Sequence, residues 1–361
     1  MKINFNLETP GVVAYARESK KGWNWFVELL VFVAVFIVAT IAQVLVMMPI
    51  ELVVMFTDKG YLEAAASGDM EHIIEASMRI ASSDALVIGS LFSTIGMILI
   101  TMLFCKLIQK RKMNSLGFVK KEILKEYGIG LVVGFAIFTI AVLISMLTGG
   151  LKLTGFSSTF ALGTFLLFGL GFMIQGMAEE VLCRSYFMVS IARRYPIWVA
   201  AVLNALFFAA LHLGNSGISV LALINLTLFG IFESVYFIKR GSIWGAAAAH
   251  SIWNFVQGNF FGIKVSGMNT SCSVLESVSV EGKDLLNGGA FGLEGSIAVT
   301  IVLVAGILFL LTMRAKDVAT EAEEVIEEPE TSDAEAVGGN VSEENVSKEN
   351  VSKENVSKET V

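Results

Sequence analysis

The sequence predicts an all-α membrane protein with about eight transmembrane helices and a membrane-embedded active site. Of its 361 residues, 55% are hydrophobic and only 16% are charged, a balance typical of chains that cross a membrane several times. Only four prolines occur, which suits long helices because proline interrupts them. The third observation is a group of ionisable residues inside apolar sequence, which favours a functional site over simple packing.

Eight apolar stretches are long enough to cross a bilayer, which takes about 20 residues in a helix. The loops support this count. If the N-terminus is cytoplasmic, the inner segments hold seventeen Lys and Arg and the outer loops hold five, an asymmetry typical of membrane proteins. We therefore expect an integral protein of a bacterial-type cell membrane, with both termini cytoplasmic and Cys272 outside. The stretches are 25–48, 85–107, 127–147, 160–191, 197–213, 218–238, 243–262 and 296–313.

The predicted organisation has four parts. Residues 1–112 hold two transmembrane helices and an outer loop whose apolar spacing predicts a short amphipathic helix. Residues 113–262 form the core that carries the ionisable group, and residues 263–313 hold an outer loop, with no functional indication, and the last helix. Residues 314–361 carry 5 basic and 14 acidic residues. This repeat-containing acidic tail is too polar to fold alone, so we predict disorder, and its charge argues against nucleic acid as a partner.

The ionisable group begins with Glu179, Glu180 and Arg184, which lie within six residues of one another in an otherwise apolar stretch. Each such group at membrane depth costs about 2.5 kcal/mol or more on insertion scales. Glu180 and Arg184 are four residues apart, so they can neutralise each other along one helix face. Glu179 points about 100° away and is left as the free carboxylate. A carboxylate in a low-dielectric site is a better base.

Two histidines also lie in apolar stretches. His212 follows Phe208 by four residues, and His250 precedes Asn254 by four, so each pair shares a helix face. From the helical rise of about 1.5 Å per residue, His212 falls at the depth of Glu179, and His250 one or two turns shallower. Neutral imidazoles could orient a water or polarise a carbonyl, and Asn254 could donate to a developing oxyanion. Phe208 alone is interpreted as packing.

A purely structural role is the alternative for each of these residues, because buried histidines and Glu–Arg pairs are often only structural. The position of the whole set inside membrane spans favours function. Glu233 is a weaker candidate. It lies near the cytoplasmic end of its span, where we expect it to reach toward water. Other weak candidates are Asn204, Asn225 and Gln257.

The motifs Glu-Glu-x-x-x-Arg at 179–184, Phe-x-x-x-His at 208–212 and His-x-x-x-Asn at 250–254 resemble those of the CAAX protease and bacteriocin-processing family. This family includes type II CAAX prenyl endopeptidases and bacterial self-immunity proteins. The resemblance covers about residues 113–262. It implies a membrane-embedded endopeptidase that uses a glutamate-activated water on a membrane-embedded or lipidated peptide or protein in the bilayer. The implied catalytic residues are Glu179, His212, His250 and Asn254, supported by Glu180, Arg184 and Phe208.

Three alternatives stay open. Glu179, His212 and His250 could form a zinc site with two histidine ligands and one glutamate, although the metal-free interpretation, without a cofactor, is preferred because no His-Glu-x-x-His occurs. A non-catalytic immunity or scaffold protein would bind a partner within the membrane, and the intact set of polar residues argues against it. A proton-coupled transporter would also use Glu and His, but it predicts internal repeats that the spans do not show.

Overall fold

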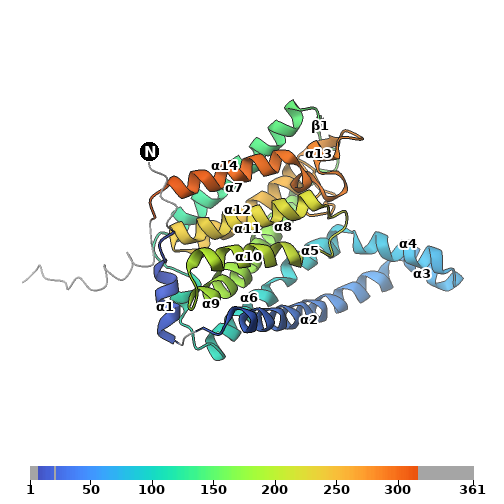
Figure 1. The fold of residues 1–361 in the computed structure, drawn as a ribbon. Helices are drawn as coiled ribbons and strands as arrows, with labels where there is room; N and C mark the ends of the chain where they lie inside the picture. The colour runs from blue at the N-terminus through green and yellow to red at the C-terminus, as the bar shows by residue number, and fades with distance from the viewer. Residues whose placement is uncertain (1–6, 20–21, 316–361) are drawn as a thin grey trace, which may run out of the picture.

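Helices make up almost the whole of the computed structural model, which describes residues 7–19 and 22–315 (Figure 1). The long helices lie alongside one another as a bundle, and α1 (Gly11–Ser19) lies across one end of it. The predicted all-α class of a polytopic membrane protein is confirmed for these residues. The acidic tail after residue 315 lies outside the described residues, so its predicted disorder stays a prediction.

All eight predicted spans contain a helix, but the helices differ in length. Five helical segments of the described chain are long and apolar enough to cross a membrane. Two others, α10 and α14, have 15 and 16 residues, shorter than the roughly 20 that a perpendicular crossing takes. The helices of the spans are α2 (Trp25–Thr57), α5 (Asp84–Ser93) with α6 (Ile95–Leu107), α7 (Ile123–Leu147), α8 (Leu162–Glu180), α10 (Ile197–Leu211), α11 (Val220–Arg240), α12 (Ile243–Phe255) and α14 (Ile297–Thr312).

Helix α2 runs nine residues beyond its predicted end and carries Pro49 in its interior. Its 33 residues span about 50 Å, well beyond the roughly 30 Å hydrocarbon core of a bilayer. Two short helices, α3 (Lys59–Ser67) and α4 (Met70–Ala81), follow at its far end, away from the rest of the bundle (Figure 1). One amphipathic helix was expected here. The structure has two because Asp58 and Asp69 each cap a separate helix start.

The long fourth span is not one continuous α-helix. Directly after Glu180, α8 passes into a π-helix, η2 (Val181–Met188), which is followed by α9 (Val189–Ala192). Every residue of η2 is buried. π-Helical turns are rare and occur often at functional sites, and this one carries Arg184. A second π-helix, η3 (Val256–Phe260), continues α12 directly after the His250–Asn254 turn.

Glycines let α12 lie unusually close to its neighbours. A methyl group at Gly130 or Gly134 of α7 would overlap the backbone carbonyl oxygen of Gly245 or Ala249 in α12. On the other side, a methyl group at Gly176 of α8 would lie 2.8 Å from the Ser251 backbone nitrogen. Small residues at helix contacts allow such close approach in membrane proteins. Helix α12 is thereby held tightly between α7 and α8. This close packing fixes the positions of the α12 side chains, including those of His250 and Asn254.

The predicted outer loop at residues 263–295 is folded rather than irregular. Strand β2 (Leu275–Ser279) pairs antiparallel with β1 (Leu151–Phe156), with Leu151 opposite Ser279. This strand pair was not expected from the sequence. Cys272, expected in an outer loop, is only 1% exposed. The remaining short helices are η1 (Met113–Leu116), α13 (Asp284–Asn287), η4 (Gly289–Phe291) and η5 (Leu293–Gly295).

Candidate active site

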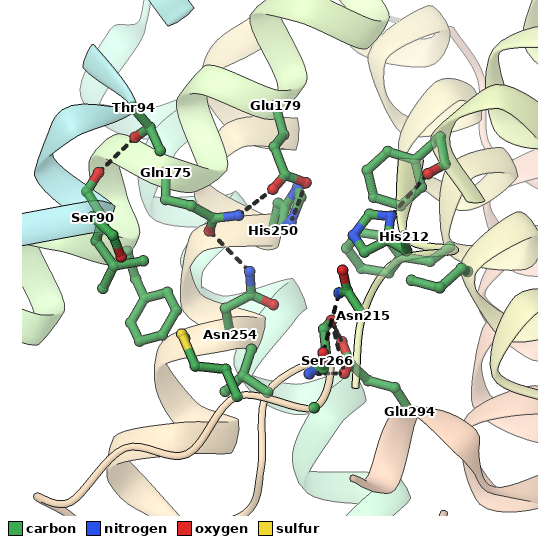
Figure 2. Close-up of a pocket in the computed structure, with 18 of the residues that line it drawn as sticks. Ser90, Thr94, Gln175, Glu179, His212, Asn215, His250, Asn254, Ser266 and Glu294 are labelled. Atoms are coloured by element: carbon green, nitrogen blue, oxygen red, sulfur yellow. Dashed lines mark hydrogen bonds and ion pairs between the residues drawn. The ribbon is translucent and has the colours of Figure 1, made fainter. Parts of the chain in front are cut away.

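A cavity of about 510 Å³ lies among α2, α5, α8, α10, α11 and α12, with the 263–295 segment on its wall. The side chains of all four residues predicted as catalytic line it (Figure 2). They come from three helices that are far apart in sequence. Its polar lining comprises Gln43, Ser90, Thr94, Gln175, Glu179, His212, Asn215, Ser216, His250, Asn254, Ser266 and Glu294, and its apolar lining includes Leu91, Phe172, Phe208, Leu226, Phe229, Val265 and Met268.

Glu179 lies two residues before the π-helix, and its carboxylate faces the cavity. Its side chain is 25% exposed, whereas that of Glu180 is fully buried. Its Oε1 accepts a hydrogen bond from the Gln175 amide, one helical turn earlier. Its Oε2 lies 3.7 Å from Nε2 of His250. Of the two adjacent glutamates, Glu179 is therefore the one that a molecule in the cavity can reach.

Glu180 joins an arginine and a histidine in the buried layer behind Glu179. Its Oε1 accepts from Nη1 of Arg184 at 2.8 Å and lies 2.8 Å from Nδ1 of His250. We assign the proton of the neutral His250 ring to Nδ1, because this contact requires a donor there. Nδ1 then donates to Glu180, and the lone pair of Nε2 faces Glu179. A carboxylate that fixes the tautomer and orientation of a catalytic imidazole is a common arrangement. Glu180 thus contacts His250 as well as Arg184, a contact that helical spacing alone did not predict.

Phe208 packs against three of the other site residues. The Arg184 guanidinium carbon lies 4.6 Å from the Phe208 ring centroid, a distance that gives a cation–π interaction. The same ring lies 4.9 Å from the His212 ring and 6.0 Å from the His250 ring, centroid to centroid. Phe208 is itself only 2% exposed. It separates the buried ion pair from the cavity and packs against both imidazoles.

His212 stands at the C-terminus of α10, on the opposite side of the cavity from Glu179 and His250 (Figure 2). Its Nδ1 lies 2.9 Å from the Phe208 carbonyl oxygen. Because a carbonyl only accepts, Nδ1 carries the proton. Nε2 is then unprotonated and takes no part in the hydrogen bond to Phe208. The two imidazoles are therefore both held through Nδ1, each with Nε2 available for chemistry.

Asn254 lies one turn after His250 on α12. Its amide nitrogen donates to Gln175 Oε1 at 3.0 Å, and the Gln175 amide donates in turn to Glu179. Gln175 therefore connects the predicted base with the predicted oxyanion donor. Gln175 was not predicted as a site residue. The available signal was its position four residues before Glu179, which puts both side chains on one helix face.

The 263–295 segment brings two more polar residues to the cavity. Glu294 accepts from the Ser266 backbone N–H and, at 3.0 Å, from its hydroxyl. The Asn215 amide, three residues past His212, donates to the Ser266 carbonyl oxygen at 3.1 Å. Burial raises the pKa of the Glu294 carboxyl, and the hydrogen bonds from Ser266 oppose that rise. These contacts bind the segment to the rim of the cavity, and nothing in the sequence spacing pointed to them.

Glu233 does not reach toward water, so that prediction was wrong. Its side chain is fully buried in α11, and within the described part of the chain neither carboxylate oxygen has a hydrogen-bond partner. Its span is longer at the C-terminal end than expected, because α11 continues to Arg240. The Glu233 side chain therefore starts about two turns inside the helix end. Asn204 and Asn225 bond within the protein, to Ser234 and to the Glu294 carbonyl oxygen, and do not line the cavity.

Residues 161–256 match the family model described as type II CAAX prenyl endopeptidase Rce1-like. This confirms the resemblance to the CAAX protease family. The matched segment contains all seven residues that the three motifs supplied and ends before Ser266 and Glu294. It is narrower than the 113–262 range of the resemblance. No curated protein and no solved structure matches the chain. The roles of individual residues stay predictions, which the geometry makes testable.

Proposed function

We propose that this protein is an intramembrane endopeptidase in which Glu179 activates the water that cleaves a peptide bond. The observation that carries the proposal is the arrangement of Glu179 and Glu180 on the two ring nitrogens of His250. One carboxylate faces the cavity 3.7 Å from Nε2 of His250, while a second, buried carboxylate holds Nδ1 of the same ring. A freely reachable base beside a fixed imidazole is suited to hydrolysis.

In the proposed reaction, a water positioned by Glu179 and His250 attacks the carbonyl carbon of the substrate. The water oxygen forms the new C–O bond while its proton passes to the Glu179 carboxylate. The negative charge that develops on the carbonyl oxygen is stabilised by a hydrogen bond from the Asn254 amide. His212, whose free Nε2 only accepts, orients the water or the leaving amine from across the cavity. Glu179 then returns the proton to the amine nitrogen as the C–N bond breaks. No net proton is gained or lost by Glu179 over the cycle.

The substrate we propose is a membrane-embedded or lipidated peptide or protein. The chain is an integral membrane protein with five segments able to cross a bilayer, so its cavity lies among membrane helices. The apolar residues of the cavity wall, such as Phe172, Phe229 and Met268, suit a chain or lipid group that leaves the bilayer. A prenylated substrate fits this chemistry, as does the membrane-bound precursor of a peptide.

Zinc is the alternative to a metal-free mechanism. Among the described residues, no three His, Cys, Asp or Glu side chains are grouped so that they could hold a metal ion. In this arrangement His250 Nδ1 is engaged by Glu180 and His212 Nδ1 by Phe208, so a metal would be held through Nε2 of each. Chelation of the purified enzyme decides the point. Loss of activity that zinc restores would replace Glu179 as base with a metal-bound water.

The deciding experiment compares membrane peptides of cells that express the wild type, Glu179→Ala, or Glu63→Gln. Glu63 is an exposed carboxylate on α3, so its variant controls for expression and for loss of a negative charge. We expect cleavage products that disappear with Glu179→Ala and persist with Glu63→Gln. Identical peptide profiles for wild type and Glu179→Ala would instead favour the non-catalytic immunity or scaffold role.

A further inference from the structure

A second cavity lies on the opposite side of the bundle from α2, between α7, α11 and α14. Helices α7 and α14 run side by side there (Figure 1). The cavity has a volume of about 430 Å³, and its walls are almost wholly apolar. Val132, Ile140 and Phe309 on these walls are 69%, 49% and 64% exposed. We call this cavity the α7/α14 groove. In an integral membrane protein such side chains meet lipid hydrocarbon.

One end of the α7/α14 groove carries three cations. Lys239 and Arg240 end α11, and Arg314 follows α14. The Arg240 guanidinium is paired through two nitrogens with the Glu126 carboxylate. Three positive charges and one negative charge therefore gather at this end, a local excess of two. The same end contains the Lys and Arg turns that we predict to be cytoplasmic.

Among the three cations, Lys239 gives the strongest indication that an anion binds at this end of the groove. It is only 8% exposed, and its ammonium donates to the Met313 carbonyl oxygen at 3.0 Å. In the described part of the chain no carboxylate lies within ion-pair distance of it. A buried ammonium without a counter-charge is costly. A ligand that brings an anion to the end of an apolar groove would remove that cost.

We propose that the α7/α14 groove binds one anionic phospholipid, with an acyl chain between α7 and α14 and the phosphate at Lys239 and Arg314. Both halves of the site are needed to specify this ligand. A free phosphate would leave the apolar walls uncovered, and an apolar partner helix would leave the cations unpaired. The acidic tail carries charge of the right sign, but its polar composition does not suit the walls. Basic pockets between membrane helices on the cytoplasmic side are known to bind lipid head groups.

The test measures lipid binding to the full-length protein in detergent by native mass spectrometry. Phosphatidylglycerol is compared with phosphatidylcholine of the same acyl chains, so that only the head-group charge differs. We expect one tightly bound phosphatidylglycerol per protein and weaker binding of phosphatidylcholine. Arg314→Gln should weaken phosphatidylglycerol binding about fivefold, the effect expected for one cation near an anionic lipid. Lys239→Met should weaken binding by a similar factor. Arg314 is exposed, so Arg314→Gln tests the proposal even if Lys239→Met does not fold.

Two further variants separate the groove from its charged end. Ala305 lies on the groove wall and is exposed, so Ala305→Phe fills the groove without entering the core. Val304 is exposed on another face of α14, outside the groove, and Val304→Phe is its matched control. Lys106→Gln removes an exposed cation at the same end of the bundle, on α6. Both controls should bind like the wild type, and Ala305→Phe should lose the tightly bound lipid.

Equal affinity of the wild type for the two lipids would overturn the proposal. So would an effect of Lys106→Gln as large as that of Arg314→Gln, which would show a diffuse surface charge. Tight binding of phosphatidylglycerol to Ala305→Phe would show that the head group alone is recognised and that the groove is not used. The measurement is of binding and stands whether or not the chain is a peptidase.

Discussion

Nδ1 of His250 lies 2.8 Å from Oε1 of Glu180, although 70 residues separate them. This contact gives the two adjacent glutamates different surroundings. Glu180 is occupied by His250 and Arg184, while Glu179 faces the cavity and touches the other nitrogen of the same ring. Neighbouring carboxylates whose surroundings differ are the usual way in which a protein divides catalytic and supporting roles.

Glu179→Gln should lower kcat by about 10²–10⁴-fold, the typical contribution of a general base, and leave the protein folded. Glu180→Gln should harm stability more and chemistry less than Glu179→Gln, because glutamine can still accept a hydrogen bond from His250.

The double variant Glu179→Gln/His250→Ala should have a kcat little lower than that of either single variant, since the effects of groups that act together are not additive. Cleavage of a membrane-embedded substrate by purified variants measures these effects. Near wild-type turnover by Glu179→Gln would remove it from the role of base.

Arg184→Ala should destabilise the protein by about 3–5 kcal/mol, the usual cost of removing one partner from a buried pair. The Arg184 and Glu180 side chains are both fully buried, so Glu180 would be left with an uncompensated charge, and the Phe208 ring would lose the guanidinium above it. Thermal unfolding in detergent measures the change. The control is Arg79→Ala, which breaks the exposed pair with Asp58 and should leave stability nearly unchanged. Equal effects of the two variants would contradict the importance of burial here.

Helical spacing was enough to predict the local parts of the site. The Glu180–Arg184 pair and the shared face of His250 and Asn254 follow from residues four apart, and the structure contains both. Depth along each helix placed Glu179 and His212 in one layer and His250 one or two turns shallower. The structure brings all three side chains to one cavity, although the π-helix after Glu180 shifts the register of the next turn.

Other parts of the site depend on contacts that no local pattern records. Gln175 reaches Asn254 only because α8 and α12 approach closely at Gly176. The 263–295 segment has neither helical nor strand periodicity along most of its length, so its contact with the cavity through Glu294 could not be anticipated. Glu233 was misplaced because its depth was judged from an assumed helix end, and α11 ends two residues later than expected.

Glu294 should make the stability of the protein depend on pH. Burial raises its pKa above the ordinary value of 4.5 in the folded protein. Because the folded pKa is the higher one, Glu294 contributes stability at pH values below about 4.5, and that contribution is lost as the pH rises through the folded pKa. Thermal unfolding as a function of pH should show this fall in the wild type and a flatter profile in Glu294→Gln. The same slope in both proteins would assign the effect to another group.

The predicted orientation can be tested with introduced cysteines. The natural cysteines Cys105, Cys183 and Cys272 are all buried, so they should give little background, and Cys272 itself cannot report the outer side. Leu285→Cys, at a position 62% exposed in the predicted outer segment, should react with an impermeant thiol reagent on intact cells. Lys110→Cys, exposed at the predicted inner end, should react only after lysis. The reverse pattern would invert the topology.

Gln175→Leu should reduce kcat by about 10²-fold, the cost of moving a catalytic group by about 1 Å. Leucine fills a similar volume but makes neither hydrogen bond, so Glu179 and Asn254 would both lose the amide that connects them. Gln175→Glu is the more revealing variant. It keeps an acceptor for Asn254 but places a second carboxylate beside Glu179, and like charges at this distance make one of them hold its proton. The pH–rate profile of this variant should shift toward higher pH, whereas an unchanged profile would show that Glu179 is not the group whose ionisation governs the rate.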